Sequence, residues 1–292
     1  MSVTDTIRQI KSGLWAFEPH YALGLKGTVE KILSQQPNEA LAKENLEARH
    51  YLIDENGHKY NSKSINEVPS GSIGIIHITG PMIKYGNYYC WGADELVAQA
   101  EAFDNNPSII GQIWVFDTGG GAVNSVAVYR NFLAKKKKPI LSWCDMCASA
   151  GIWVATGTNY IMAQNNISSS FGSIGVMASL RSAKKYWEDM GVIDHTIYAD
   201  QSDHKNKSFD LALEGKYELI KKEHLNPLAI KFQETVKSDL PKLNLEVEGI
   251  ISGKMFYAEE AVQFGLINSI GSFEKAIEKL NELAAVQTIM YN

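Results

Sequence analysis

The chain has 292 residues, of which 45% are hydrophobic and 21% are charged, and its formal net charge is -5. This length allows one large domain or two smaller ones, each able to bury an apolar core. The acidic balance gives no electrostatic basis for binding nucleic acid or an anionic membrane, and without a run of ~18 apolar residues no membrane span is predicted.

The first 65 residues predict a small helical arm. Residues 1–13 lack the apolar core of a secretory signal, so we expect a cytoplasmic location. Residues 28–35 and 38–52 carry apolar side chains three or four positions apart, which is typical of helices. Residues 54–64 are polar and rich in turn formers, and they connect this arm to the rest of the chain.

From Ser72 onward, apolar strand-like segments alternate with short helical ones. We expect strands over residues 72–80, 109–121, 139–143, 159–164 and 194–199, and a turn followed by a strand within residues 170–180. We expect helices over residues 93–105, 123–138, 150–157, 181–191 and 211–240, and two more around a short strand within 258–280. This alternation favours an α/β fold with a mostly parallel sheet in one main domain, residues 66–285, followed by a C-terminal tail, residues 286–292.

Three consecutive glycines, Gly119 to Gly121, stand where the strand at 109–121 passes into a helix. This is a position at which α/β sheets bind ligands, and glycines let the backbone approach a ligand closely. The run matches neither the Walker motif nor the spacing of a dinucleotide-binding motif. It is either a tight turn or a source of peptide N–H groups for an oxyanion, and the residues alone leave both open.

Ser149 lies between two alanines at the next junction of strand and helix, in the stretch CASAG. Its hydroxyl could cap the helix. It could equally be a nucleophile, because the N–H of Ala150 at the start of the helix has no acceptor within that helix and could bind a developing oxyanion. One N–H from the glycine run and one from Ala150 would form a hole with two donors.

A nucleophilic serine needs a base, and the residues do not identify it. None of the seven histidines has a recognisable triad context, although His195 and His204 follow the serine within range. Lys205 and Lys207 lie in a polar loop and are the other candidates. The pattern indicates α/β hydrolase-like chemistry but does not identify the base.

Two local patterns have plain structural explanations. The basic run Lys135–Lys138 precedes Pro139, where a helix would end, and cations suit that end. Cys144 and Cys147 match a redox or half-zinc spacing, and Cys90 is the third cysteine. A structural zinc site needs four ligands, so we favour ordinary buried thiols in a reducing compartment and expect no metal or organic cofactor.

Five motifs in order resemble one family: DTGGGAV, ASAGIWVAT, GSIGV, an HK loop and EEAVQFGLINSIG. They are similar to those of the serine peptidases that include signal peptide peptidase A and the phage prohead, or capsid maturation, proteases. The resemblance covers residues 72–280. It implies the fold shared by Clp protease and the enoyl-CoA hydratases (crotonases), with repeated β-β-α units and a mostly parallel sheet.

The resemblance also implies a Ser-Lys dyad that cleaves peptide bonds through an acyl-enzyme. It places the nucleophile at Ser149, the base at Lys205 and a base-orienting hydroxyl at Ser173. The oxyanion donors expected here are the N–H groups of Gly120, Gly121 and Ala150. Three departures from the family stand in this sequence: Gly119 where relatives often carry proline, Lys207 close to Lys205, and Pro227 within a helix.

The resemblance further implies self-association into a homo-oligomeric ring that acts on polypeptides. Residues 13–22 resemble the start of phage-type members, which favours a prohead protease that trims capsid and scaffold proteins in the host cytoplasm over a soluble protease that clears peptide remnants. One rival is an acyl-CoA hydratase or thioesterase of the related fold. Another is a catalytically inactive capsid-assembly subunit, and a reactive serine distinguishes the peptidase from both.

Overall fold

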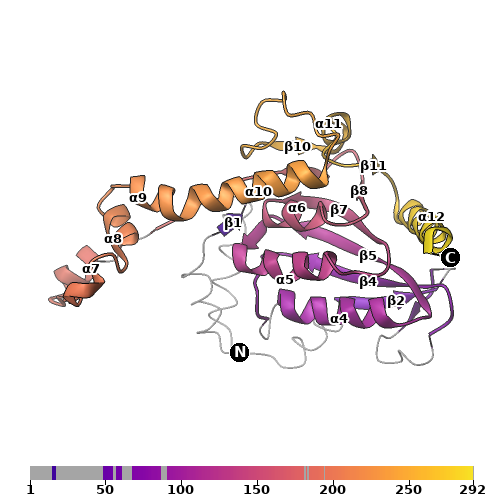
Figure 1. Cartoon of the computed structure of the whole chain (residues 1–292), viewed down its shortest axis with the longest axis horizontal. Coiled ribbons are helices and arrows are strands. Elements are labelled where there is room, and N and C mark those ends of the chain that lie inside the picture. Colours follow the sequence, from indigo (N-terminus) through magenta and orange to yellow (C-terminus); the bar gives the residue numbers. More distant parts are fainter. Residues whose placement is uncertain are drawn as a thin grey trace.

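The computed structural model describes residues 15–17, 49–54, 57–60, 68–86, 91–180, 182, 184–193 and 195–291. Its centre is a nine-stranded sheet with helices on both faces (Figure 1). The path β10-β9-β7-β5-β4-β2-β3 runs across this sheet, and β8 branches from β7 to pair with β11. The pairs among β4, β5, β7, β8, β9 and β11 are parallel, whereas β2, β3 and β10 join antiparallel. The expected α/β fold with a mostly parallel sheet is therefore confirmed.

The strands follow the apolar segments of the sequence. The bounds are β2 His50–Ile53, β3 Lys59–Tyr60, β4 Ser72–Thr79, β5 Ile109–Thr118, β7 Ile140–Ala148, β8 Tyr160–Ala163, β9 Ser170–Gly172, β10 Met255–Tyr257 and β11 Ser269–Ile270. Two short strands, β1 Trp15–Phe17 and β6 Gly120–Ala122, pair with each other outside this sheet.

Both faces of the central strands are buried, because helices cover each face. Along β5, Trp114 and Phe116 belong to the larger apolar cluster, and the alternate residues Ile113 and Val115 belong to the smaller one. The larger cluster packs under α4 Ala93–Asn105, α5 Val123–Leu133, α6 Ala150–Ala155, α10 Asn226–Asp239 and α11 Ala258–Gln263. The smaller cluster packs under α12 Phe273–Tyr291.

A helical arm, residues 177–225, leaves the body and extends well beyond the sheet (Figure 1). It carries α7 Lys184–Asp189, a 3₁₀ turn Asp200–Ser202, α8 Lys207–Leu213, α9 Glu218–Ile220 and a π-helical turn Lys221–Leu225. The strand expected over 194–199 is wrong: residues 195–199 form no strand. Pro227 stands in the first turn of α10, directly after the π-helical turn Lys221–Leu225, so the helical run that leads from the arm into α10 departs from regular α-helix just before the proline, as expected.

The structure also differs from the secondary structure expected near the two ends of the chain. The helix expected over 38–52 is wrong at its end, because residues 50–53 form β2 and pair with β4. The sheet therefore includes residues that precede position 66. The helix expected over 28–35 lies outside the described residues. At the other end, α12 continues to Tyr291, so the segment expected as a tail is mostly helical.

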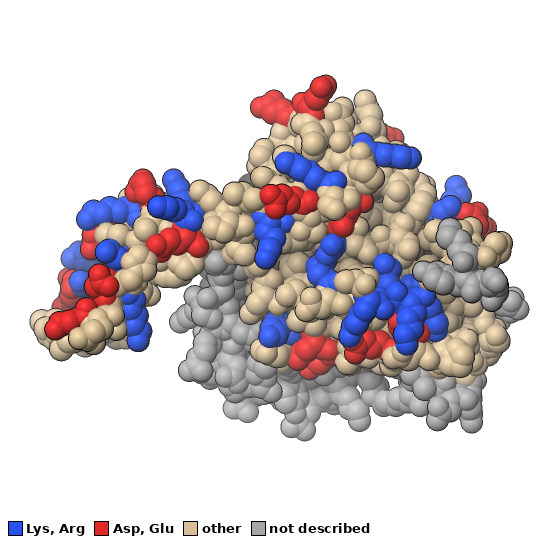
Figure 2. Space-filling view, in the orientation of Figure 1, with Lys and Arg blue, Asp and Glu red and all other residues tan. Residues whose placement is uncertain are grey.

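The basic run Lys135–Lys138 follows α5, which ends at Leu133. Asp104 accepts the backbone N–H groups of Lys137 and Lys138, and Lys135 pairs with Glu101 at 2.8 Å. On the face drawn in Figure 2, basic side chains lie beside acidic ones in this region. No helix in the described ranges is long and apolar enough to cross a membrane.

Candidate active site

Ser149 stands between β7 and α6 in a strained conformation. Its φ of 53° and ψ of -115° lie outside the regions that residues with a Cβ prefer. The side chain is fully buried, and within the described part of the chain Oγ has no hydrogen-bond partner. The hydroxyl therefore does not cap α6, which was the structural alternative.

Backbone hydrogen bonds hold Ser149 in place. Its N–H donates to the carbonyl oxygen of Gly172 at 2.9 Å, and its own carbonyl accepts the N–H of Trp153 at 3.0 Å. Gly172 ends β9 and pairs with Ala148 of β7, so Ser173 follows directly beside Ser149. Ser173 also has a positive φ, 52°, and only 8% of its surface is exposed.

The glycine run forms β6 and a turn before it. Gly120 has a φ of 98°, which glycine tolerates at no steric cost. Gly121 lies so close to the Met82 backbone that a Cβ at this position would collide with it. Met82 donates its N–H to the Gly120 carbonyl at 2.9 Å and accepts the Ala122 N–H at 2.8 Å. This segment is thus fixed on one side by Met82.

Thr118 holds the glycine turn in place, a contact that the sequence did not predict. Its buried hydroxyl donates to the carbonyl of Gly80 at 2.6 Å and accepts the N–H of Gly120 at 3.0 Å. The Gly120 N–H therefore already has an acceptor within the chain. A Cβ added to Gly151 of α6 would lie 2.7 Å from the Thr118 methyl group, so Thr118 separates the glycine turn from this helix. The available signal was a threonine directly before a glycine run at a strand end.

Lys205 does not lie next to Ser149 within the same chain. Lys205 is exposed in the turn that precedes α8, on the arm, and Lys207 begins α8 itself. His204 is also on the arm, where Nε2 lies 2.9 Å from Glu223 Oε1. The structure thus brings together Ser149, Ala150 and Ser173, with the glycine turn packed against α6, and it leaves all three candidate bases of this loop elsewhere.

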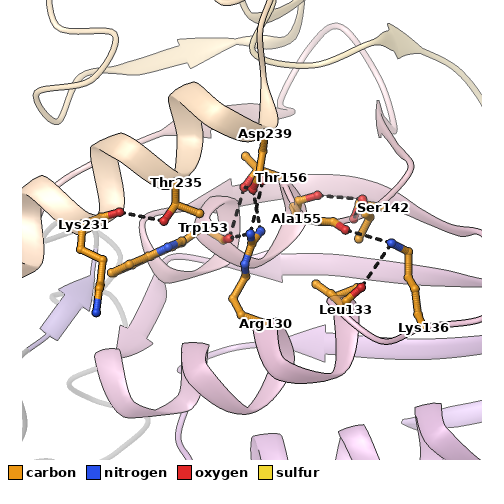
Figure 3. A network of polar contacts seen from close by, with 12 residues as sticks. Arg130, Leu133, Lys136, Ser142, Trp153, Ala155, Thr156, Lys231, Thr235 and Asp239 are labelled. Atoms are coloured by element: carbon orange, nitrogen blue, oxygen red, sulfur yellow. Dashed lines mark hydrogen bonds and ion pairs between the residues drawn. The ribbon is translucent and has the colours of Figure 1, made fainter.

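Helix α6, which follows Ser149, is held against α10 by polar and aromatic contacts (Figure 3). Asp239, at the end of α10, pairs with Arg130 of α5 at 2.6 Å and accepts the hydroxyl of Thr156 at 2.8 Å. Trp153 of α6 stacks on Phe232 of α10, with ring centroids 4.2 Å apart and nearly parallel planes. Because α10 continues from the arm, this clamp connects the arm to the Ser149 helix.

The cysteines near the site behave as buried thiols. Cys144 and Cys147 are both free and fully buried. Burial, together with a hydrogen bond from the Cys144 thiol to Cys147, raises the pKa of the Cys144 thiol, so the thiol stays protonated and is a poor nucleophile or metal ligand. Cys90 lies outside the described residues. Among the residues that are described, no group of three or more His, Cys, Asp and Glu side chains could hold a metal ion.

A model of peptidase family S49 matches residues 132–287 of this chain. Protease 4 of Salmonella typhi is 26% identical over 274 residues, which cover 91% of this chain and 42% of that protein. A putative protease of Synechocystis sp. is 28% identical over 171 residues, which cover 58% of this chain and 60% of that protein. The chain thus spans less than two thirds of the length of either relative.

Among solved structures, a mutant of the 1510-N membrane-bound stomatin-specific protease superposes with a TM-score of 0.47 and 15% sequence identity. The superposition covers 70% of this chain and 82% of that chain.

Proposed function

The chain belongs to peptidase family S49, and on that premise we propose that it is a serine endopeptidase with Ser149 as nucleophile and Lys205 as base. One observation carries the proposal: the strained backbone and unpaired buried hydroxyl of Ser149. Each of these features costs on the order of 1–3 kcal/mol, and a purely structural serine has no reason to keep both.

The proposed reaction follows the acyl-enzyme route. A neutral lysine amine takes the proton of the Ser149 hydroxyl as the oxygen attacks the peptide carbonyl. The N–H groups of Gly121 and Ala150 then stabilise the oxyanion, since Gly120 already donates to Thr118. The protonated lysine returns the proton to the leaving amine, and water activated by the same lysine hydrolyses the ester. Ser173 beside the nucleophile orients the lysine.

Lys205 is proposed to come from a neighbouring copy of the chain. Lys205 lies on the arm, and Ser149 Oγ finds no partner among the described residues of its own chain. The arm exposes an unusual number of large apolar side chains, which favours a protein contact. They include Tyr186, Trp187, Met190, Val192, Ile193, Ile197, Leu213 and Tyr217. A homo-oligomer that buries them would also remove water from the lysine and so favour its neutral form.

The arm also contains a cavity of about 520 Å³ that suits such a contact. Leu180, Leu213, Ile220 and Leu225 contribute its apolar walls. An apolar side chain from an adjacent subunit would fill it. The proposed assembly is therefore a ring in which each arm reaches the Ser149 junction of the next subunit.

The proposed substrates are polypeptides bound in extended form. The resemblance of residues 13–22 to the start of phage-type members supports a prohead protease that acts on capsid or scaffold proteins. The other possible role in this class is clearance of peptide remnants. Cleavage of purified scaffold protein, compared with cleavage of hydrophobic signal-peptide fragments, distinguishes the two roles.

The mechanism is tested with three single variants and a fluorophosphonate probe. We expect Ser149→Ala to lose labelling and at least ~10³-fold in kcat for peptide cleavage, and Lys205→Ala to lose nearly as much, because members of a catalytic unit are not additive. Lys207→Ala is the matched control and should keep most activity. Cleavage by purified Ser149→Ala would overturn the nucleophile, and an active Lys205→Ala beside an inactive Lys207→Ala would exchange the two lysines.

A further inference from the structure

A short N-terminal strand lies along the glycine segment of the site. Strand β1, Trp15–Phe17, pairs antiparallel with β6, with Trp15 opposite Ala122, Ala16 opposite Gly121 and Phe17 opposite Gly120. About a hundred residues separate the two strands in the sequence. Figure 1 shows β1 at the side of the body from which the arm extends.

The pairing uses the free edge of β6. Met82 occupies the other edge, where it bonds to the carbonyl of Gly120 and the N–H of Ala122. Successive residues of a strand direct their N–H and C=O groups to opposite sides. The N–H and C=O of Gly121 therefore point away from Met82 and toward Ala16 of β1.

This edge is also where an acyl substrate would lie. An extended peptide whose carbonyl reaches the Gly121 N–H must approach β6 from the side opposite Met82. A peptide that adds a strand to a sheet edge binds through its main chain, so it would make the same type of hydrogen bonds as β1. Ser149 is fully buried, so a substrate carbonyl can reach it only after a covering segment moves.

We propose that Trp15–Phe17 is an autoinhibitory strand that occupies the substrate-pairing edge of β6 and must leave before an extended peptide binds. The proposal rests on the proposed function, because that function identifies Gly121 as an oxyanion donor. A strand that belongs to the same chain binds its edge intramolecularly, so no second molecule has to be recruited. It therefore competes with substrate and raises KM, whereas kcat for bound substrate is unchanged.

The test removes one backbone donor from β1 in the full chain. Ala16→Pro deletes the N–H that faces the Gly121 carbonyl, and Ala16→Ser is the matched control because it keeps this N–H. Binding is measured by fluorescence anisotropy in a Ser149→Ala background, which prevents cleavage. The probe is a labelled peptide with the sequence of residues 13–22, GLWAFEPHYA. A second probe carries N-methyl alanine at the matching position.

We expect Ala16→Pro to bind the probe at least ~10-fold more tightly than the Ser149→Ala parent, and Ala16→Ser to bind like the parent. The N-methylated probe should bind weakly to every variant. Equal affinities in all three proteins, or no binding in any, would overturn the proposal. Hydrogen exchange in the unmodified chain is an independent measurement: pairing predicts slow exchange of the Gly121 amide, and fast exchange contradicts it.

Cleavage assays with Ser149 intact separate this proposal from the proposed function. The expected result is a KM for Ala16→Pro at least ~10-fold below that of the unmodified chain, with kcat preserved. Identical KM values with good activity in both proteins would overturn the proposal of an autoinhibitory strand but would not contradict the peptidase function. If no variant cleaves, the peptidase assignment fails, and the anisotropy result still decides whether β1 and an added peptide share this edge.

Discussion

Backbone strain concentrates around the groups proposed to react. Among the described residues, positive φ values outside glycine occur at Ser149, Ser173 and Asn206, with φ of 53°, 52° and 62°. The first two are neighbours across β7 and β9, and the third directly follows Lys205 on the arm. Asparagine tolerates this region more readily than serine does, so the two serines carry most of the strain. Such strain persists where surrounding structure enforces it, and it is typical of functional sites.

We expect the Thr118 hydroxyl to fix the position of the glycine turn and so of the Gly121 N–H, the proposed oxyanion donor. Thr118→Val keeps the shape of the side chain but leaves the Gly120 N–H buried without its acceptor. The turn should shift toward another acceptor and misplace Gly121, which lowers kcat by ~10-fold or more with little change in KM, since a donor used mainly in the transition state is affected. Thr118→Ser retains the hydroxyl and should behave like the unmodified chain. A Thr118→Val variant with unchanged kcat would exclude this positioning role.

His77 on β4 gives the fold an acid-sensitive element. Burial, assisted by the positive charges of Arg49 and Lys59, lowers the pKa of His77 from 6.5 to about 4. Between these values the unfolded chain binds a proton at this residue and the folded chain does not. The contribution of His77 to the free energy of unfolding is therefore constant above pH 6.5 and falls as the pH drops toward 4, by at most about 3 kcal/mol.

The measurement is urea unfolding at several pH values between 7 and 4, a range set by these two pKa values. His77→Gln supplies a neutral side chain of similar size, so its stability should depend less steeply on pH in this window. The difference between the two profiles isolates His77 from the carboxylates that titrate nearby. Parallel profiles for the two proteins would show that His77 does not contribute.

At the scale of elements, α6 and α10 form one unit. Trp153 stacks on Phe232, and Asp239 connects the end of α10 to Arg130 and Thr156 (Figure 3). Since α10 begins where the arm ends, the clamp fixes the direction in which the arm leaves the body. The same clamp holds the helix whose first N–H belongs to the proposed oxyanion hole.

Removing the Asp239 carboxylate should loosen this unit. Asp239→Ala leaves the partly buried Arg130 guanidinium without its partner, and we expect a loss of about 2–3 kcal/mol in the free energy of unfolding. Thr235→Ala on the exposed face of α10 is the control and should change it by less than about 0.5 kcal/mol. Thermal and denaturant unfolding measure both. Equal stability of the two variants would mean that the ion pair does not hold α10 in place.

The elements that sequence reasoning located are those whose pattern and packing agree. Helix α4 spans 93–105 as expected, because its apolar positions face the core at helical spacing. Residues 195–199 have strand-forming side chains, yet Ile197 is 92% exposed and no strand in the described part of the chain pairs with them. Strand propensity without a partner does not produce a strand. Conversely, His50–Ile53 become a strand because β4 offers an edge.

For the site, too, the sequence predicts what depends on local pattern and does not predict what depends on the three-dimensional arrangement. Local sequence suffices to place Ser149 at a strand–helix junction, since both elements carry strong apolar patterns. It cannot place Lys205 relative to Ser149, because that distance depends on the direction in which the arm leaves the body. Nor can it reveal β1, whose pairing with β6 joins segments distant in sequence and depends on main-chain groups rather than on side-chain pattern.

At the scale of the whole molecule, the arm exposes several large apolar side chains. Trp187, Met190 and Ile193 are each about half exposed or more, and apolar side chains exposed in such number favour a protein contact. The arm also holds the only base that the family resemblance identifies. A self-association that covers the apolar side chains would bring Lys205 to another subunit, so assembly and catalysis would be coupled.

This coupling predicts that two inactive variants restore activity when mixed. In a ring with shared sites, random 1:1 mixing of Ser149→Ala and Lys205→Ala subunits places an intact serine opposite an intact lysine at about a quarter of the contacts. We therefore expect peptide cleavage to recover to about that fraction of the unmodified activity after subunit exchange, with labelling of Ser149 only in the Lys205→Ala subunits. Mixing Ser149→Ala with the double variant Ser149→Ala, Lys205→Ala cannot create an intact pair and should remain inactive. If light scattering shows mixed oligomers and cleavage stays at background, the serine and lysine belong to one chain, and the arm must instead fold back onto its own body.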